Sequence, residues 1–184
     1  MNKHTTHYGL VARSLHWLMA VLIVAMLIIG LDRNLIGIHE PLGIVILVMV
    51  LIRIVVRLKN NTPTLPPEMP DWQRLAALLS HLSLYALMVT MPLVGWSMLS
   101  AEGYPIVLLG SLHLPPIAPH NIHLYLILRK AHIYFALLLS GTFLMHVSAA
   151  MFHGLIRRDG VFSSMASGGE DANVDRSKRR ARIP

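Results

Sequence analysis

The sequence has 184 residues, of which 54% are hydrophobic and only 14% charged, and its mean hydropathy is +0.57. This composition is too apolar for a soluble domain of this size and favours a membrane protein. The lack of cysteine excludes disulfides, iron–sulfur clusters and covalently attached c-type haem. The net charge of +7 does not indicate nucleic-acid binding, because most basic residues flank apolar segments or lie near the C-terminus.

The first predicted span covers residues 14–35 and follows a short basic segment. Its apolar run is long enough to cross a bilayer when its flanks are counted. A signal peptide is the competing interpretation, because a basic start also precedes the apolar run of a leader. However, no small-x-small cleavage site follows, and His16 and Trp17 would be unusual inside a disposable segment. We therefore favour a membrane span.

Two further spans are predicted at residues 37–58 and 75–99, separated by the proline-rich loop NNTPTLPPEMP. Pro41 is tolerated because it lies near the start of its helix, whereas Pro92 predicts a kink. A fourth span is predicted at 130–155, after a long Pro/Gly/His loop that contains at most a short interfacial helix. We predict an all-α, four-helix membrane domain over residues 1–158 and a flexible basic tail over 159–184.

The charges predict the orientation of this bundle. Four spans place both termini on the same side of the membrane. The N-terminal segment, the loop between the second and third spans and the tail hold most of the lysines and arginines. By the positive-inside rule, both termini are expected in the cytoplasm.

Four histidines lie in the spans at two depths. His16 and His146 share the inner half of the membrane, and His39 and His132 share the outer half. In a helix, His132 and His146 would lie on nearly the same face, about 21 Å apart along the axis. Each pair comes from two different helices, an arrangement suited to holding a planar cofactor inside a bundle.

Two b-type haems, each with two axial histidines, are the most economical interpretation. Any single buried histidine is equally consistent with hydrogen bonding between helices. That alternative is weaker for four histidines paired by depth. A metal other than haem iron is also less consistent, because the spans offer no cysteine and no obvious carboxylate ligand.

Several motifs resemble the bacterial cytochrome b561 family over residues 8–158. They are SLHWLMA, IHEPLG, RIVVRLKNNTP, SHLSLYALMVTMPLVGW and KAHIYFALLLSGTFLMH. The resemblance implies a four-helix di-haem protein of the bacterial inner membrane, with axial pairs His16–His146 and His39–His132. Its superoxide oxidase type implies oxidation of superoxide outside and reduction of ubiquinone.

Bis-histidine ligation leaves no open position on iron, so electron transfer is expected rather than oxygen binding. Near the cytoplasmic boundary, Trp17, His81 and His153 are candidates for a quinone head-group site, which needs hydrogen-bond donors and a proton supply. The resemblance also implies such a site. Helix capping or contact with haem propionates is the alternative for both histidines.

At the outer end, Arg129 and Lys130 precede His132, and Arg33 lies in the facing loop. These cations would attract superoxide, although anchoring of helix ends explains them equally well. Contact with propionates or lipid head groups is expected for Arg53 and Arg57. No metal site is expected at the remaining histidines, which lack carboxylate partners: His4, His7, His113, His120 and His123.

Two functions of different class follow. The first is a superoxide:ubiquinone oxidoreductase, with lipid, quinone and superoxide or another one-electron donor as partners. The second is a membrane anchor and electron conduit for a partner dehydrogenase or a periplasmic redox protein. The compact chain favours the first. A eukaryotic ascorbate-linked cytochrome is less consistent, because that arrangement uses six spans.

Overall fold

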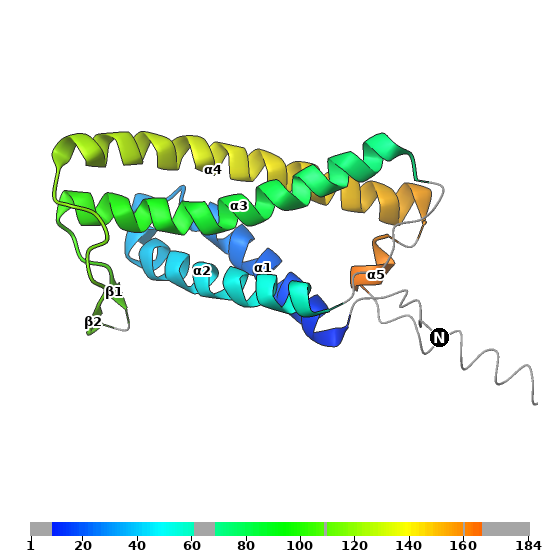
Figure 1. Ribbon diagram of the computed structural model, residues 1–184, viewed down its shortest axis with the longest axis horizontal. Coiled ribbons are helices and arrows are strands. Elements are labelled where there is room, and N and C mark those ends of the chain that lie inside the picture. Colours follow the sequence, from blue (N-terminus) through cyan, green and yellow to red (C-terminus); the bar gives the residue numbers. More distant parts are fainter. Residues whose placement is uncertain (1–8, 61–68, 109, 160, 167–184) are drawn as a thin grey trace, which may run out of the picture.

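The computed structural model describes residues 9–60, 69–108, 110–159 and 161–166, and its main feature is a bundle of four long helices (Figure 1). These helices are α1 Leu10–Ile29, α2 Ile36–Lys59, α3 Asp71–Glu102 and α4 Ile122–Met151. The smaller elements are the 3-10 turn η1 Arg33–Leu35, the strands β1 Val107–Leu108 and β2 Leu112–His113, the π-helical turn η2 Phe152–Arg157 and the short helix α5 Ser163–Ala166.

All four long helices are long and apolar enough to cross a membrane. Large apolar side chains point outward along them, for example Val21, Leu82 and Leu137, each more than 60% exposed. An apolar surface of this extent is stable against lipid but not against water. The predicted all-α, four-helix membrane bundle is therefore confirmed.

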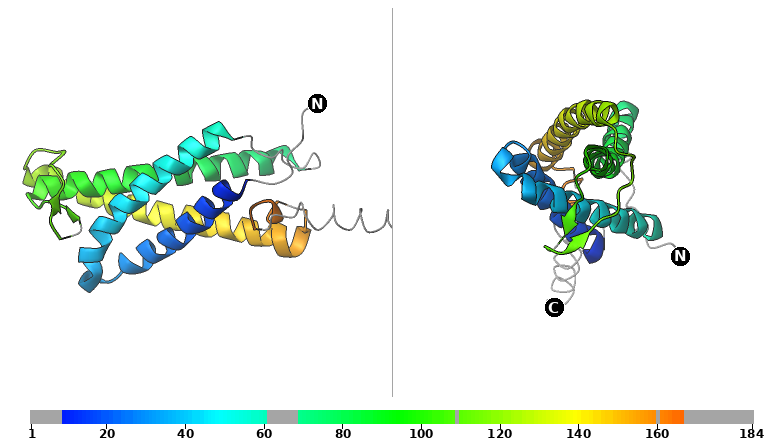
Figure 2. Two further views of the ribbon diagram at one scale, coloured as in Figure 1. Left: turned by 90° about the horizontal axis from the view of Figure 1, so that it is seen from below. Right: turned by 90° about the vertical axis from the view of Figure 1, so that its left-hand side faces the viewer.

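The helices pack in sequence order, with α3 lying along α4 and α2 contacting both α1 and α3 (Figure 2). Pro92 lies inside α3, where its ring removes one helical hydrogen bond. Figure 1 shows that α3 changes direction near its middle. This bend agrees with the kink predicted from Pro92.

A small apolar core lies at mid-depth. Its centre is Val50, which is fully buried, and Leu139 stands seven residues from both His132 and His146 on α4. The core therefore separates the two histidine depths. Its members are Met19, Ile23, Ile46, Leu47, Val50, Leu87, Met88 and Leu139.

The fourth helix begins earlier than predicted, at Ile122 instead of residue 130. The side chain of Asn121 accepts hydrogen bonds from the backbone N–H groups of His123 and Leu124, at 2.9 and 3.1 Å. This is an N-cap, which satisfies donors that the first helical turn leaves unpaired. Hydropathy alone missed it, because Arg129 and Lys130 interrupt the apolar run of α4.

The chain beyond Arg158 also differs from the prediction of a flexible tail starting at residue 159. Asp159 and residues 161–166 turn back under the bundle, where the indole N–H of Trp17 donates to the carbonyl of Met165 at 3.3 Å. Phe162 packs close to Gly154, so closely that an added Cβ at Gly154 would lie 3.0 Å from its ring. The rest of the predicted tail, like His4 and His7, lies outside the described residues.

Candidate functional site

The outer pair of histidines comes together between α2 and α4. The ring centres of His39 and His132 are 6.1 Å apart. The Nδ1 atoms of both rings are buried and have no hydrogen-bond partner among the described residues. A buried polar atom without a partner is costly, so hydrogen bonding through Nδ1 to the described residues does not account for the burial of these two rings.

Glycines make room for the outer pair. A Cβ added at Gly30 or at Gly95 would lie 3.3 Å from Cε1 of His39 or His132, respectively. Neither glycine has a positive φ angle, because Gly30 has φ −65° and Gly95 lies inside α3. Glycine is therefore needed at both positions for the close approach of a histidine ring, not for the backbone conformation. Four helices thus contribute to the outer site, two through histidines and two through glycines.

The inner pair has a similar spacing. The ring centres of His16 on α1 and His146 on α4 are 6.3 Å apart. Both members of each predicted pair are therefore neighbours, and the two pairs lie at opposite ends of the mid-depth core.

Both spacings fit two imidazoles on opposite sides of one metal ion. An imidazole nitrogen bonds zinc at about 2.0–2.1 Å, and we take a similar bond length for another metal. The nitrogen lies about 1.1 Å from the centre of its ring. Two imidazoles on opposite sides of one metal would therefore have ring centres roughly 6.3 Å apart. The observed 6.1 and 6.3 Å agree with this value. The residues present therefore fit bis-histidine haem at both depths.

The inner site contains a third imidazole. The ring of His81 on α3 lies 5.3 Å from that of His146, which is shorter than the spacing expected across a shared metal. His81 is thus a neighbour of the inner pair. The sequence predicted it near the cytoplasmic boundary of the membrane, and the structure places it closer to the inner histidines than that prediction implied. His81 gives the inner site a hydrogen-bonding group that the outer site lacks.

Arg53 also belongs to the inner site. Its guanidinium donates to Nδ1 of His16 at 2.7 Å and to the hydroxyl of Tyr85 at 3.0 Å. The guanidinium of Arg57 stacks over the same tyrosine ring, 5.7 Å from its centre. Two permanent cations therefore converge on the inner histidines from α2.

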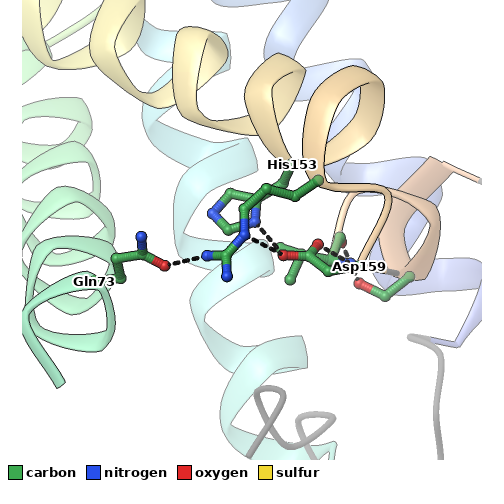
Figure 3. A network of polar contacts seen from close by, with 6 residues as sticks. Gln73, His153 and Asp159 are labelled. Atoms are coloured by element: carbon green, nitrogen blue, oxygen red, sulfur yellow. Dashed lines mark hydrogen bonds and ion pairs between the residues drawn. The ribbon is translucent and has the colours of Figure 1, made fainter. Parts of the chain in front are cut away.

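Trp17 and His153, the other candidates for a quinone site, both hold the returning C-terminal segment. Trp17 contacts Met165, as described above, and Nδ1 of His153 lies 2.6 Å from Oδ2 of Asp159 (Figure 3). His153 lies in η2, a π-helical turn, and such turns occur frequently at functional sites. The structure places His81 beside His146, and the ring of Trp17 lies 5.8 Å from that of His16, so both lie next to the haem-ligand candidates. His153 lies beside the returning segment.

Asp159 is held by several donors. Burial alone would raise the pKa of its carboxyl group, but the hydrogen bonds from His153 and from the backbone N–H of Val161, with the charge of Arg157, outweigh burial and lower the pKa below its usual value. Asp159 is therefore ionised at neutral pH. Arg157 also donates to Gln73 of α3 at 2.6 Å, which ties this end of α4 to α3 (Figure 3).

The outer cations lie about two turns after the start of α4. Arg129 and Lys130 are exposed there, and within the described part of the chain neither forms an ion pair. The loop histidines do not converge: His113 donates to the carbonyl of Ser111, and His120 lies against Gly103. Within the residues that the structure describes, no group of three or more potential metal ligands occurs.

Four residues of these sites were not anticipated from the sequence: Gly30, Gly95, Tyr85 and Asp159. The two glycines lie 65 residues apart on different helices, so only the fold shows that both face histidines. Tyr85 gave a weak signal as a polar side chain within an apolar span. Asp159 stands six residues after His153, a spacing that connects them only because η2 ends in a turn with a positive φ angle at Arg158.

Comparison with known proteins identifies the family. A profile described as prokaryotic cytochrome b561 matches residues 7–168, which is most of the chain. The chain is 29% identical to cytochrome b561 homolog 1 of Escherichia coli over 129 residues, covering 69% of this chain and 72% of the relative. It is 28% identical over 119 residues to cytochrome b561 homolog 2 of the same organism, covering 59% and 63%.

A third relative is named a probable superoxide oxidase, CybB, of Yersinia pestis. It is 27% identical over 128 residues, covering 70% of this chain and 72% of the relative. Membrane electron transfer with b-type haem is characteristic of this family, and the four candidate spans agree with a bacterial inner-membrane protein. The extent of the profile match and the four-helix bundle together show that the chain belongs to the prokaryotic cytochrome b561 family.

Proposed function

We propose that this protein transfers electrons from superoxide at the outer face of the membrane to ubiquinone at the inner level. The observation that carries the proposal is the pair of histidine couples, 6.1 and 6.3 Å between ring centres, at opposite ends of one apolar core. The similarity to a probable superoxide oxidase supports the choice of donor.

In this proposal His39 and His132 hold the outer haem b, and His16 and His146 hold the inner one. When bound, each haem would supply one-electron transfer. If His16 held its hydrogen on Nδ1 in the haem-bound protein, that atom would not accept from Arg53. The guanidinium of Arg53 would then be available to a carboxylate of the haem.

The proposed orientation places the inner level toward the cytoplasm. The end of the bundle that carries His16 and His153 also carries Arg53, Arg57, Lys59 and Arg157, whereas the opposite end carries Arg129 and Lys130. This asymmetry agrees with the positive-inside rule. Both termini would then lie in the cytoplasm.

The overall reaction consumes two superoxide ions, one ubiquinone and two protons, and it yields two molecules of oxygen and one ubiquinol. At the outer face, Arg129 and Lys130 are exposed and would raise the local concentration of the anionic donor. At the inner level, His81, His153 and Trp17 would donate hydrogen bonds to the quinone carbonyls, and the histidines would supply protons. Ubiquinone is uncharged, so it reaches this level through the lipid.

The test uses the purified full-length protein with its haem. We expect two haems per chain, rapid haem reduction when superoxide is added, and reoxidation when a soluble ubiquinone analogue follows. If the haem is reduced no faster with superoxide than in buffer without it, superoxide is not the electron donor. Haem that stays reduced in the presence of the quinone would contradict the acceptor.

The alternative is a membrane electron conduit for a separate dehydrogenase or periplasmic redox protein. The same experiment distinguishes it, because a conduit would be reduced slowly by superoxide while still carrying two haems. The inner site argues against a simple conduit. It holds three histidines, whereas two are sufficient to ligate one haem.

A further inference from the structure

The end of α4 carries a pair of side chains that haem ligation does not require. His153 and Asp159 are mostly buried, with 14% and 20% of their side chains exposed, and Nδ1 of the histidine lies 2.6 Å from Oδ2 of the aspartate (Figure 3). The backbone N–H of Val161 donates to the other carboxylate oxygen at 3.3 Å. The carboxylate is thus held in place on both oxygens.

A second contact fixes this pair relative to the bundle. The Nε atom of Arg157 lies 3.8 Å from Oδ2 of Asp159, and its Nη1 donates to Gln73 of α3. Arg157, on η2, is therefore a cation that faces the pair, and α3 contributes the neutral amide of Gln73. Asp159 also starts the segment that returns to Trp17 of α1. Contacts from η2 and α3 therefore hold the carboxylate that faces the imidazole.

The carboxylate determines where the imidazole keeps its hydrogen. An ionised carboxylate can only accept, so Nδ1 of His153 must be the donor. In the neutral ring Nε2 is then without a hydrogen, and it is the atom at which a second proton is bound and released. Without the carboxylate, either nitrogen can carry the hydrogen.

We propose that Asp159 is a positioning residue that holds His153 in the tautomer whose Nε2 delivers protons to ubiquinone. This inference rests on the proposed quinone reduction. In each transfer the Nε2–H bond of the imidazolium breaks, an O–H bond forms on the reduced quinone oxygen, and the ring becomes neutral. Cytoplasmic water then reprotonates Nε2. Two transfers accompany the two electrons, which come from superoxide, and complete one ubiquinol.

The first part of the test measures the tautomer directly. Full-length holoprotein labelled with 15N-histidine is examined by NMR, and His153→Gln assigns the resonances. We expect the wild-type ring to carry its hydrogen on Nδ1, and Asp159→Asn to shift the population toward Nε2. Asp71→Asn is the matched control, because it removes an exposed carboxylate at the start of α3, at the same end of the bundle, and should leave the tautomer unchanged.

The second part measures proton-coupled quinone reduction. Protein reduced with stoichiometric dithionite is mixed with decylubiquinone, and haem reoxidation is followed by absorbance. We expect Asp159→Asn to slow reoxidation roughly 10- to 100-fold, the usual effect of removing an orienting partner of a functional histidine. Asp159→Glu should restore most of the rate, and Asp71→Asn should match the wild type. Haem content and reduction by superoxide should be the same in all variants.

The outcomes are separable. A wild-type His153 with its hydrogen on Nε2 overturns the inference without any variant, so it stays testable if Asp159→Asn fails to fold. Equal reoxidation rates in the wild type and Asp159→Asn overturn it while leaving quinone reduction intact. Wild-type haem that decylubiquinone does not reoxidise contradicts the proposed function itself, and the inference falls with it.

Discussion

The outer and inner histidine sites have nearly the same spacing but very different surroundings. At the outer site, two imidazoles face two glycines, and the buried Nδ1 atoms have no protein partner among the described residues. At the inner site, the two imidazoles are joined by His81, Arg53 and Tyr85. Two histidine pairs with the same spacing thus have different neighbours on one scaffold, and among the described residues polar side chains contact the inner pair.

This difference matches what each end is proposed to do. Oxidation of superoxide to oxygen releases an electron and needs no proton, so an outer site with few polar groups is sufficient. Reduction of a quinone needs donors and protons, which histidines supply near neutral pH. Substitutions at each site should therefore have different effects.

Removal of a ligand should empty one site only. His132→Ala leaves His39 without a partner, so we expect the outer haem to be lost and the haem content to fall from two to one per chain. His81→Ala should keep both haems, because His81 lies too close to His146 for the two rings to share a metal. The number of haems per chain is measured by the pyridine haemochrome assay together with the protein concentration. Loss of a haem from His81→Ala would reverse the assignment of the inner ligands.

The glycine beside the outer pair should be almost as important. In Gly95→Ala the new methyl group would press on Cε1 of His132 at 3.3 Å, and overpacking of a close-packed site costs about 1–3 kcal/mol. We expect weaker binding of the outer haem, seen as faster haem loss to apomyoglobin. Gly141→Ala on α4 is the control, since its Cβ would meet nothing within 4 Å. Equal haem loss from both variants would remove the proposed role of Gly95.

The cation at the inner site should affect only the inner haem. Arg53→Met removes a positive charge next to His16, and loss of this charge disfavours the reduced form, which carries one more electron. We expect the inner midpoint potential to fall by tens of millivolts while the outer potential changes little. Redox titration followed by absorbance measures both. Lys59→Met, an exposed cation at the end of the same helix, serves as the control.

The exposed outer cations should have a smaller, salt-dependent effect. Neutralising Arg129 and Lys130 together should lower the rate of haem reduction by superoxide a few-fold at low ionic strength. The difference should shrink in high salt, because charges on the surface are screened over about 10 Å at 0.1 M. Stopped-flow rates at several salt concentrations give the comparison. A wild-type rate that does not depend on salt would argue against electrostatic steering.

The smallest expected effect is on titration of Asp159. Its pKa is lowered in the folded protein, so the hydrogen bonds it makes contribute stability above the ordinary carboxyl value of 3.8 and lose it as the pH falls through the lower, folded value. We expect a titration midpoint below 3.8 in 13C-aspartate NMR spectra, with the signal assigned by Asp159→Asn. A midpoint at or above that value would contradict the contact with His153 in solution.

Much of this structure could be predicted from the sequence, because its strongest signals are local. Four apolar runs define the spans, and the depths of His16, His39, His132 and His146 follow from counting along helices whose rise is fixed. The N-cap at Asn121 was also a local signal, but the cations about two turns into α4 concealed it.

The surroundings of the histidines could not be predicted in this way. The approach of Arg53 to His16 and of Gly95 to His132 depends on how the helices are rotated and tilted against each other. The contact between His153 and Asp159 depends on a π-helical turn and a residue with positive φ, which hydrophobic periodicity does not reveal. Sequence periodicity thus gave the depth of each histidine but not its neighbours.

The apolar core between the two sites has an electrical consequence. Val50, Leu139 and their neighbours form an apolar barrier that is costly for ions and protons to cross, whereas electrons can tunnel through it. In the proposed direction, negative charge moves inward through this barrier while protons are consumed on the cytoplasmic side. Each turnover would therefore add to a membrane potential that is negative inside, so detoxification of superoxide would help to energise the membrane.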